Sequence, residues 1–161
     1  TRKLMKKILF PAFLLLSACG TASVDRSAIT DKHPRQIVSA YSYYGWTEQS
    51  HRQELEELVG VDPVETEWCA AFVNAVLTEE GIEGSDTVSA FPLTARSFLM
   101  WGEEVTTPQS GDIVVFPRGE PWQGHVPNYL ILGGNQDDSV NLSFYPASLA
   151  ISIRRNLPQS L

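Results

Sequence analysis

The sequence predicts a single domain of the α+β class behind an N-terminal export segment. Apolar residues recur at helical spacing up to about residue 102, and after that point they alternate as they do in β-strands. Leading helices followed by a small antiparallel sheet form an α+β arrangement. With 161 residues, of which 43% are hydrophobic, the chain is long enough for one such domain with a core of its own.

Two helices are predicted at the start of the domain. The first includes Pro34, which suits the first helical position, and ends at Gly45. The second is expected over residues 50–60, with Ser50 as the N-cap and Gly60 as the residue that ends it. Each has apolar residues on one side, so each is expected to pack one face against the core.

The third predicted helix carries the residue on which the functional analysis depends. It is expected to begin after Thr66, a suitable N-cap, with Glu67 in its first turn, and to end at Gly81. A fourth helix is expected over residues 92–102. The apolar stripe of the third helix has the spacing of a buried face and consists of Cys69, Phe72, Val73, Val76 and Leu77.

The second half of the domain is predicted to be an antiparallel sheet. Its residues alternate between apolar and polar side chains and are interrupted by glycine- and proline-rich turns. Strands are expected over residues 112–116, in two short pieces of residues 124–136 around Pro127 and Asn128, over residues 139–146 and over residues 149–155.

The first 18 residues have the pattern of a signal peptide. An apolar run over residues 8–18 is too short to span a bilayer but suits the core of such a peptide. Translation from Met5 would give the opening MKKILF, which is typical of signal peptides. The basic residues that precede the run are Arg2, Lys3, Lys6 and Lys7.

The apolar run ends in LSAC, residues 16–19, which resembles a bacterial lipobox. The resemblance implies cleavage before Cys19 and lipidation of its thiol, and Gly20 implies an outer-membrane position facing the periplasm if the cell is Gram-negative. Residues 19–33 would then be the lipidated cysteine and a flexible tether, and residues 34–161 the domain. A signal peptide without lipid and a plain hydrophobic anchor are the alternatives.

Charge restricts the partners of the mature chain. Without the first 18 residues, 8 basic and 19 acidic side chains remain, a formal net charge of −11. A chain this acidic is not expected to bind nucleic acid through a phosphate-neutralising patch. It is expected to stay at a membrane through its lipid and not through a basic surface.

Cys69 is the candidate nucleophile. If Cys19 carries lipid, Cys69 is the one remaining cysteine of the chain, and a lone thiol in an exported protein is a candidate reactive group. A helix N-terminus stabilises a thiolate, and its backbone N–H groups can bind a developing oxyanion. The alternative is that Cys69 is a small apolar side chain on the core face of its helix.

A nucleophilic thiol needs a base, usually histidine, and a polar group that orients the imidazole. Of the three histidines, His33 lies beside the tether and His51 at a polar helix start, whereas His125 lies between a glycine-rich loop and an apolar strand. His125 is therefore the candidate base and Asn135, in GGNQ, the candidate orienting residue. The alternative for His125 is a histidine at the end of a strand that hydrogen-bonds to the backbone. The alternative for Asn135 is a turn residue that tolerates left-handed backbone.

No metal and no organic cofactor are predicted, because no second cysteine or nearby histidine supplies the spacing of a metal site. Asp137 and Asp138 are assigned to a turn. Trp68 and Trp122 are candidates for contact with a substrate, and packing in the core or in a loop is the alternative for each.

Several motifs resemble, in the same order, the bacterial and phage family of small CHAP- and NlpC-like hydrolases, which are papain-like cysteine enzymes. The resemblance covers roughly residues 36–155. The motifs are EWCAAFVNAVL at residues 67–77, GDIVVFPRG at 111–119, GHV at 124–126, LGGNQDDSV at 132–140 and the closing IRR at 153–155.

The resemblance implies a papain-like fold, with the cysteine at a helix N-terminus packed on a small antiparallel sheet, and a monomeric peptidase or amidase. The usual substrate of the family is peptidoglycan. Carried over motif by motif, Cys69 matches the nucleophile, His125 the base and Asn135 the third polar position. Gln136 is an alternative for that third position and a candidate for contact with the substrate.

The chain departs from the family pattern at HVPNYLILGGNQ, residues 125–136, which is shorter than the hairpin of the family and has Pro127 where the family has glycine. Proline cannot donate to a strand ladder. Either Pro127 and Asn128 form a tight turn in a shortened hairpin, or the strand of His125 is displaced. The second case predicts an inactive member of the family that acts as a cell-wall-binding or envelope-interaction module.

Overall fold

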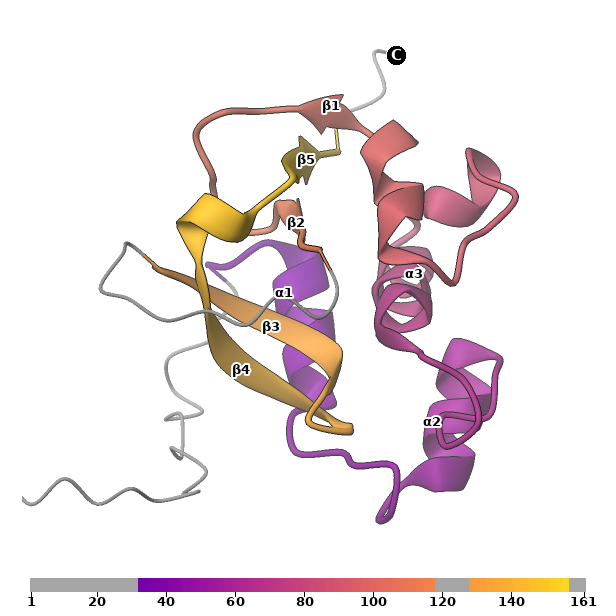
Figure 1. Ribbon diagram of the computed structural model, residues 1–161. Coiled ribbons are helices and arrows are strands. Elements are labelled where there is room, and N and C mark those ends of the chain that lie inside the picture. The colour runs from indigo at the N-terminus through magenta and orange to yellow at the C-terminus, as the bar shows by residue number, and fades with distance from the viewer. Residues whose placement is uncertain (1–31, 118–127, 157–161) are drawn as a thin grey trace, which may run out of the picture.

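The three α-helices precede the strands along the chain, so the α+β prediction is confirmed (Figure 1). The computed structural model describes residues 32–117 and 128–156. Cys19, Trp122 and His125 lie outside these residues. None of the described helices is long and apolar enough to cross a membrane. The α-helices are α1 (Arg35–Ser42), α2 (Arg52–Val59) and α3 (Cys69–Glu79), the 3₁₀ helices are η2 (Ser85–Thr87), η3 (Ala95–Met100) and η4 (Ala147–Leu149), and the strands are β1 (Glu103–Glu104), β2 (Ile113–Val115), β3 (Asn128–Gln136), β4 (Ser139–Pro146) and β5 (Ser152–Arg155).

The first two helices each begin one residue later than predicted. Pro34 is the N-cap of α1 and not its first helical residue. The N-cap of α2 is His51 and not Ser50, because the Ser50 hydroxyl bonds to Thr47 Oγ1 at 2.8 Å and to His51 Nδ1 at 2.7 Å, before the helix starts. Gly60 ends α2 as predicted, with a left-handed φ of 74°.

Helix α3 begins at Cys69, so the prediction that this residue lies at a helix N-terminus is confirmed. The prediction that Thr66 is the N-cap is wrong. The N–H of Thr66 donates to the carbonyl of Asp62 at 3.0 Å and closes a turn, so the helix starts only after this turn. Trp68 occupies the cap position without a side-chain cap bond, and Glu67 lies outside the helix.

The helix predicted over residues 92–102 is shorter than expected and is the 3₁₀ helix η3. The carbonyl of Pro92 accepts a hydrogen bond from Asn74 Nδ2 of α3 at 3.3 Å, so it serves a tertiary contact before η3 begins. Gly102 follows η3 with a φ of 58°, and a Cβ atom at this position would lie 2.4 Å from the carbonyl oxygen of Arg155. Glycine is therefore required where η3 turns into β1.

The strands form two antiparallel sheets and not the one small sheet that was predicted. The first has the strand order β1-β5-β2, and the second is the hairpin of β3 and β4. Asn128 is the first residue of β3 and pairs with Pro146, whereas Pro127, the other residue of the predicted tight turn, lies outside the described residues. Asp137 and Asp138 form the hairpin turn as predicted, with φ values of 50° and 56°, the positive φ that a two-residue type I′ turn requires.

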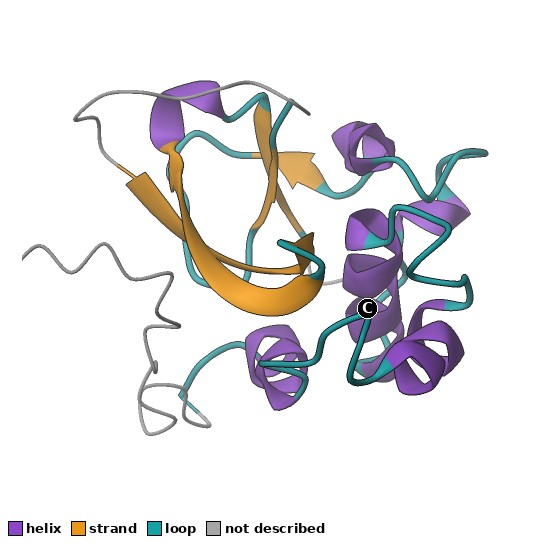
Figure 2. Cartoon of the chain, turned by 60° about the horizontal axis from the view of Figure 1, so that its bottom comes forward, coloured by secondary structure: helices purple, strands orange, loops and turns teal. Residues whose placement is uncertain are grey.

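Helix α3 lies between two apolar clusters of the core. Figure 2 shows most of the helices gathered on one side of the strands. Of the predicted stripe of α3, Phe72, Val76 and Leu77 are buried, while Val73 and Cys69 are half-buried. The buried residues of the first cluster are Ala40, Leu55, Trp68, Ala71, Phe72, Val76 and Val140, and those of the second are Ala70, Leu77, Phe98, Trp101 and Val115.

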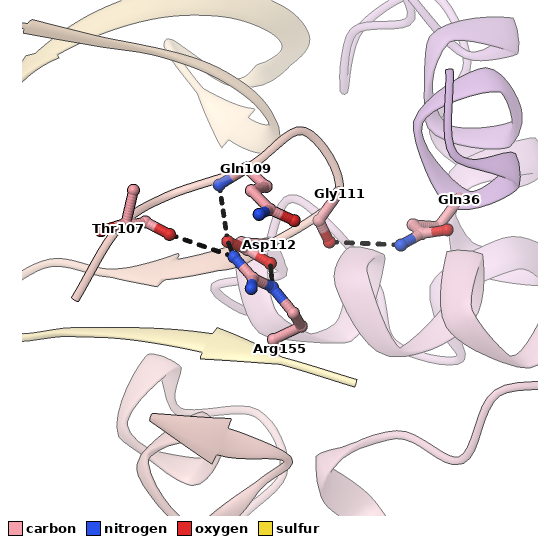
Figure 3. A network of polar contacts seen from close by, with 6 residues as sticks. All are labelled: Gln36, Thr107, Gln109, Gly111, Asp112 and Arg155. Atoms are coloured by element: carbon pink, nitrogen blue, oxygen red, sulfur yellow. Dashed lines mark hydrogen bonds and ion pairs between the residues drawn. The ribbon is translucent and has the colours of Figure 1, made fainter. Parts of the chain in front are cut away.

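A polar network holds the start of β2 against β5 and α1 (Figure 3). Arg155 donates to both carboxylate oxygens of Asp112 at 2.7 Å, and Asp112 Oδ2 also accepts from the N–H of Gln109 at 2.7 Å. Burial alone would raise the pKa of Asp112, but these hydrogen bonds and the charge of Arg155 hold it below its usual 3.8. Gln36 Nε2 donates to the carbonyl of Gly111 at 3.2 Å, which joins α1 to the network.

Candidate active site

Cys69 occupies the first helical position of α3, where backbone N–H groups of the first turn have no acceptor within the helix. These N–H groups and the positive end of the helix dipole stabilise an anion at this place. The Cys69 side chain is half-buried and is not in a disulfide. A helix N-terminus of this kind is the environment in which reactive cysteines occur.

A cavity of about 790 Å³ opens beside Cys69. A volume of this size is typical of ligand sites, which bury most of a small molecule between apolar walls and a few polar groups. Its lining residues come from helices α1, α3 and η3, from strands β2, β3 and β4, and from the loop before β2. The polar residues that line it include Glu67, Asn135 and Gln136.

A β-bulge brings strand β3 to the N-terminal end of α3. Gly133 pairs with Asn141 and Gln136 pairs with Ser139, so two residues of β3 stand opposite one residue of β4. One of the two is Gly134, which is buried against α3. A Cβ atom on Gly134 would lie 2.6 Å from Cζ3 of Trp68, so only glycine allows this approach.

Asn135, the second bulge residue, points toward the segment that precedes Cys69. Its φ is 55°, in the left-handed region that asparagine tolerates better than most residues. Its Nδ2 donates to Oε2 of Glu67 at 2.7 Å, although the two residues are 68 positions apart in the chain. The structure thus brings Asn135 to the start of α3, where it lines the same cavity as Cys69.

Gln136 also lines the cavity, and its amide binds the hairpin itself. Its Nε2 donates to the carbonyl of Asn141 at 2.7 Å and lies 3.1 Å from Asn141 Oδ1, while Asn141 Nδ2 donates back to the carbonyl of Gln136 at 2.7 Å. Because Gln136 is buried, these bonds satisfy a polar group that would otherwise destabilise the fold. Gln136 therefore holds the bulge in shape.

An aromatic group faces the cavity from the strands. Tyr129 of β3 pairs directly with Tyr145 of β4, and the ring of Tyr145 stacks on Phe116, with ring centroids 4.8 Å apart. All three residues line the cavity. Burial raises the pKa of Tyr145 above its usual 10.0, and the charges of Asp137 and of an ionised Cys69 raise it further. The folded state therefore favours the protonated phenol of Tyr145.

Trp68 lies in the core and not in the wall of the cavity. Its side chain is fully buried, its Nε1 donates to Glu48 Oε1 at 2.8 Å, and its ring meets Phe72 edge to face. The expectation that Trp68 contacts a substrate is therefore corrected. The indole is buried in the core, where Gly134 packs against it, and no part of it is exposed. Trp122, the other tryptophan predicted to contact a substrate, lies outside the described residues.

Of the histidines, two lie in the described residues. His51 stacks on Trp46 with ring centroids 4.7 Å apart, at the polar start of α2 where it was expected. His33, which was expected to lie only beside the tether, lines the cavity. His125, the predicted base, lies outside the described residues.

The sequence patterns missed three contributors to the cavity. His33 precedes the first helix in a segment without periodicity, so no local signal places it there. The sequence around Tyr145 predicts only a strand, and the register of the hairpin is needed to show that Tyr145 pairs with Tyr129. Glu67 was assigned to the first turn of a helix, and its acidic charge beside a motif cysteine was the one signal that could have drawn attention to it.

Among residues 32–117 and 128–156, no group of three or more histidine, cysteine or acidic side chains is arranged to hold a metal ion. In comparisons with known proteins, no family model matches the chain, and no significant match was found among curated proteins or solved structures.

Proposed function

We propose that this chain is a cysteine hydrolase with a papain-like catalytic arrangement, which cleaves peptide or amide bonds of peptidoglycan. The observation that carries the proposal is the position of Cys69, which begins α3 and lines a cavity together with Asn135. A cysteine at a helix N-terminus in a partly exposed site is the environment in which nucleophilic thiols occur. The order of the motifs around Cys69, described above, supports the same class of enzyme.

In the proposed reaction, the Cys69 thiolate attacks the carbonyl carbon of the amide bond and forms a tetrahedral intermediate. The backbone N–H of Cys69 lies at the start of α3 and can donate to the oxyanion of this intermediate. Collapse of the intermediate expels the amine and leaves a thioester on Cys69. Water then attacks the thioester, which releases the acid and regenerates the thiol.

His125 is proposed to take the proton of the Cys69 thiol and to pass it to the leaving amine. Asn135 is proposed to accept a hydrogen bond from the imidazole and so to hold the ring in the productive orientation. Glu67 already accepts from the amide nitrogen of Asn135, so the carbonyl oxygen is the end of that amide left to meet an imidazole N–H. This mechanism needs no metal and no organic cofactor.

Peptidoglycan is proposed as the substrate because the chain resembles a cell-wall hydrolase family and carries a lipobox-like sequence at Cys19. A lipid on Cys19 and a tether of about a dozen residues would let the domain reach the wall from a membrane surface. The acidic character of the mature chain argues against nucleic acid as the partner.

The test is digestion of purified peptidoglycan by the full-length protein in detergent, with the soluble products separated by chromatography and identified by mass spectrometry. We expect new amide-cleavage products from the wild type and none from Cys69→Ala. We expect His125→Ala to lower kcat by about 10²-fold or more, which is the usual size of a lost general base. Equal product profiles from the wild type and Cys69→Ala would remove Cys69 from the mechanism.

The other two histidines provide matched controls. His51→Ala alters a half-buried ring that stacks on Trp46 and does not line the cavity, so it should leave kcat unchanged. His33→Ala alters a residue of the cavity wall, and a larger loss of kcat from this variant than from His125→Ala would assign the base to His33 instead. Binding of peptidoglycan without any cleavage by the wild type would favour the wall-binding module over the hydrolase.

A further inference from the structure

The cavity beside Cys69 extends along one face of α3. Its lining includes Cys69, Val73, Val76 and Leu77, which occupy positions i, i+4, i+7 and i+8 of one helical stripe. Because an α-helix rises about 1.5 Å per residue, this stripe follows the helix axis for about 12 Å from Cys69 to Leu77. The cavity therefore continues well beyond the thiol, along the side of α3 that faces the strands.

The far part of the cavity is apolar and buried. Beside Leu77 of α3, its lining residues include Phe98 of η3 and Val115 of β2. Each of these three residues is only 2% exposed and belongs to the second apolar cluster of the core. Cys69, by contrast, is half-buried. The cavity thus leads from a half-buried thiol to an apolar end within the core.

Three polar residues that line the cavity are hydrogen-bonded within the fold. Gln36 Nε2 donates to the carbonyl of Gly111, and the carboxylate of Asp112 accepts two hydrogen bonds in the same network (Figure 3). Gln136 directs its amide into the β3–β4 hairpin. A buried water forms about three hydrogen bonds, whereas a cavity with apolar walls stays dry and takes up apolar molecules. The far part of this cavity is therefore suited to an apolar occupant.

An acyl chain suits this part of the cavity better than a peptide does. Each peptide unit carries an N–H and a C=O group, and burial of these groups without hydrogen-bond partners is unfavourable. A saturated acyl chain has neither group and gains free energy with each methylene that it buries. In the thioester that the proposed reaction forms, the acyl carbon is bonded to Cys69 Sγ. The chain therefore starts at the thiol, where it can follow α3 into the cavity.

We propose that the cavity is an acyl-chain site and that the substrates of Cys69 include amides whose acyl part is a long apolar chain. This inference rests on the proposed function for the chemistry of Cys69 and adds a class of substrate to it. Attack of Sγ on the acyl carbon breaks the C–N bond, and the amine leaves with the thiol proton. Water then cleaves the thioester to give the fatty acid and the thiol. Among the described residues, the lining includes Glu67 and Asp112 and neither lysine nor arginine, so no such cation retains the carboxylate of the product.

Acyl p-nitroanilides with acyl groups from acetyl to decanoyl test the dependence on chain length. The full-length protein is kept in a detergent with a rigid sterol body, because a detergent with an alkyl chain would compete for the cavity. We expect kcat/KM to rise by up to about fourfold for each added methylene, the fold-change that corresponds to about 0.8 kcal/mol, and to level off once the chain fills the cavity. Hydrolysis at a kcat/KM that does not depend on chain length overturns the acyl-chain site and leaves the hydrolase intact.

Val73→Phe tests the path of the chain, because Val73 is half-buried and lines the cavity one turn after Cys69. We expect this variant to lower kcat/KM about tenfold or more for the decanoyl substrate and to leave the acetyl substrate within about twofold. Val38→Phe is the matched control, since Val38 is 38% exposed on α1 and does not line the cavity, and it should change neither value. Equal losses for both substrates in Val73→Phe overturn the path along α3. If Val73→Phe lacks a cooperative thermal transition, Ile131→Phe on β3 takes its place.

Binding without chemistry separates the two proposals. Calorimetric titration of Cys69→Ala should show tighter binding of the decanoyl than of the acetyl p-nitroanilide, with a negative heat-capacity change that marks the burial of apolar surface. Equal affinities for the two compounds overturn the acyl-chain site. Tighter binding of the decanoyl compound, together with a wild type that hydrolyses neither, overturns the hydrolase and leaves the acyl-chain site in place.

Discussion

Gly134 of β3 lies directly against Trp68, the residue that caps the helix of Cys69. A Cβ atom on Gly134 would lie 2.6 Å from Cζ3 of Trp68 and 2.7 Å from Cβ of Phe72, closer than such atoms approach in folded proteins. Both aromatic side chains are fully buried and cannot move aside without disturbing the core. The bulge of β3 can therefore pack this closely on the start of α3 only because residue 134 has no side chain.

Gly134→Ala is expected to destabilise the protein by about 1–3 kcal/mol, the usual cost of an added group in a packed core. Urea unfolding followed by tryptophan fluorescence measures the change. Gly133→Ala is the matched control, because the three atoms nearest to its new Cβ would belong to the Gln136 side chain, none closer than 3.3 Å. Equal midpoints for the two variants would contradict the packing that we describe for Gly134.

Tyr145→Phe tests the aromatic wall of the cavity. The substitution keeps the ring that stacks on Phe116 but removes the hydroxyl of a residue that lines the same cavity as Cys69. If that hydroxyl donates to a bound substrate or to the intermediate, kcat/KM for peptidoglycan fragments should fall about tenfold, the effect of one lost hydrogen bond of about 1.4 kcal/mol, with unchanged thermal stability. An unaltered kcat/KM would restrict Tyr145 to packing.

Arg155→Ala is expected to lower the free energy of unfolding by about 2–3 kcal/mol, because it leaves a buried carboxylate without its charged partner. The side chain of Asp112 is only 4% exposed and receives two hydrogen bonds from Arg155. Arg155→Lys keeps the charge but cannot form both bonds, so it should fall between the wild type and Arg155→Ala. Chemical denaturation of the three proteins at neutral pH gives the comparison.

The pH dependence of stability should reflect Asp112. Its pKa is held below 3.8 in the folded protein, so the folded state favours the ionised carboxyl. The contribution is complete at pH values above the unfolded pKa and is lost as the pH falls through the folded pKa. We expect Asp112→Asn to be less stable than the wild type at pH 7 and to lose less of its stability between pH 5 and pH 2, as measured by urea midpoints.

At alkaline pH, the stability of the protein should instead fall as the pH rises, because of Tyr43. Burial and the hydrogen bond of its hydroxyl to Glu79 raise the pKa of Tyr43 from 10.0 to about 12, so the folded state favours the protonated phenol. This stability is present below pH 10 and is lost as the pH rises toward 12. Tyr43→Phe should reduce the fall in thermal midpoint between pH 9 and pH 11. A fall as steep as that of the wild type would show that Tyr43 does not titrate in this range.

Several elements could be predicted from the sequence because local chemistry determines them. Apolar residues at helical spacing predicted α3, and the position of Cys69 at its start follows from where that spacing begins. Gly60 ends α2 because a left-handed residue closes its last turn, and Asp137 and Asp138 form a turn because both tolerate positive φ. Each of these features depends on neighbours a few residues away.

The register of the hairpin could not be predicted from its turn. Counting back from the Asp137–Asp138 turn without a bulge would place Tyr129 opposite Pro146, whereas the bulge at residues 134–135 places it opposite Tyr145. Since successive strand residues face opposite sides, an offset of one residue decides which side chains meet in the cavity. The bulge itself depends on the packing of Gly134 against α3, a contact that periodicity does not encode.

The sequence by itself determined the fold class, a helix with Cys69 near its start, the turn between β3 and β4 and the choice of Cys69 and Asn135 as candidates. Only the tertiary structure decided that Trp68 is a core residue, that Tyr145 and His33 line the cavity and that Glu67 holds the amide of Asn135. The physical reason is the range of the interactions. Hydrogen bonds of turns and the burial of one helix face act between near neighbours, whereas the site depends on close packing between segments that lie far apart in the chain.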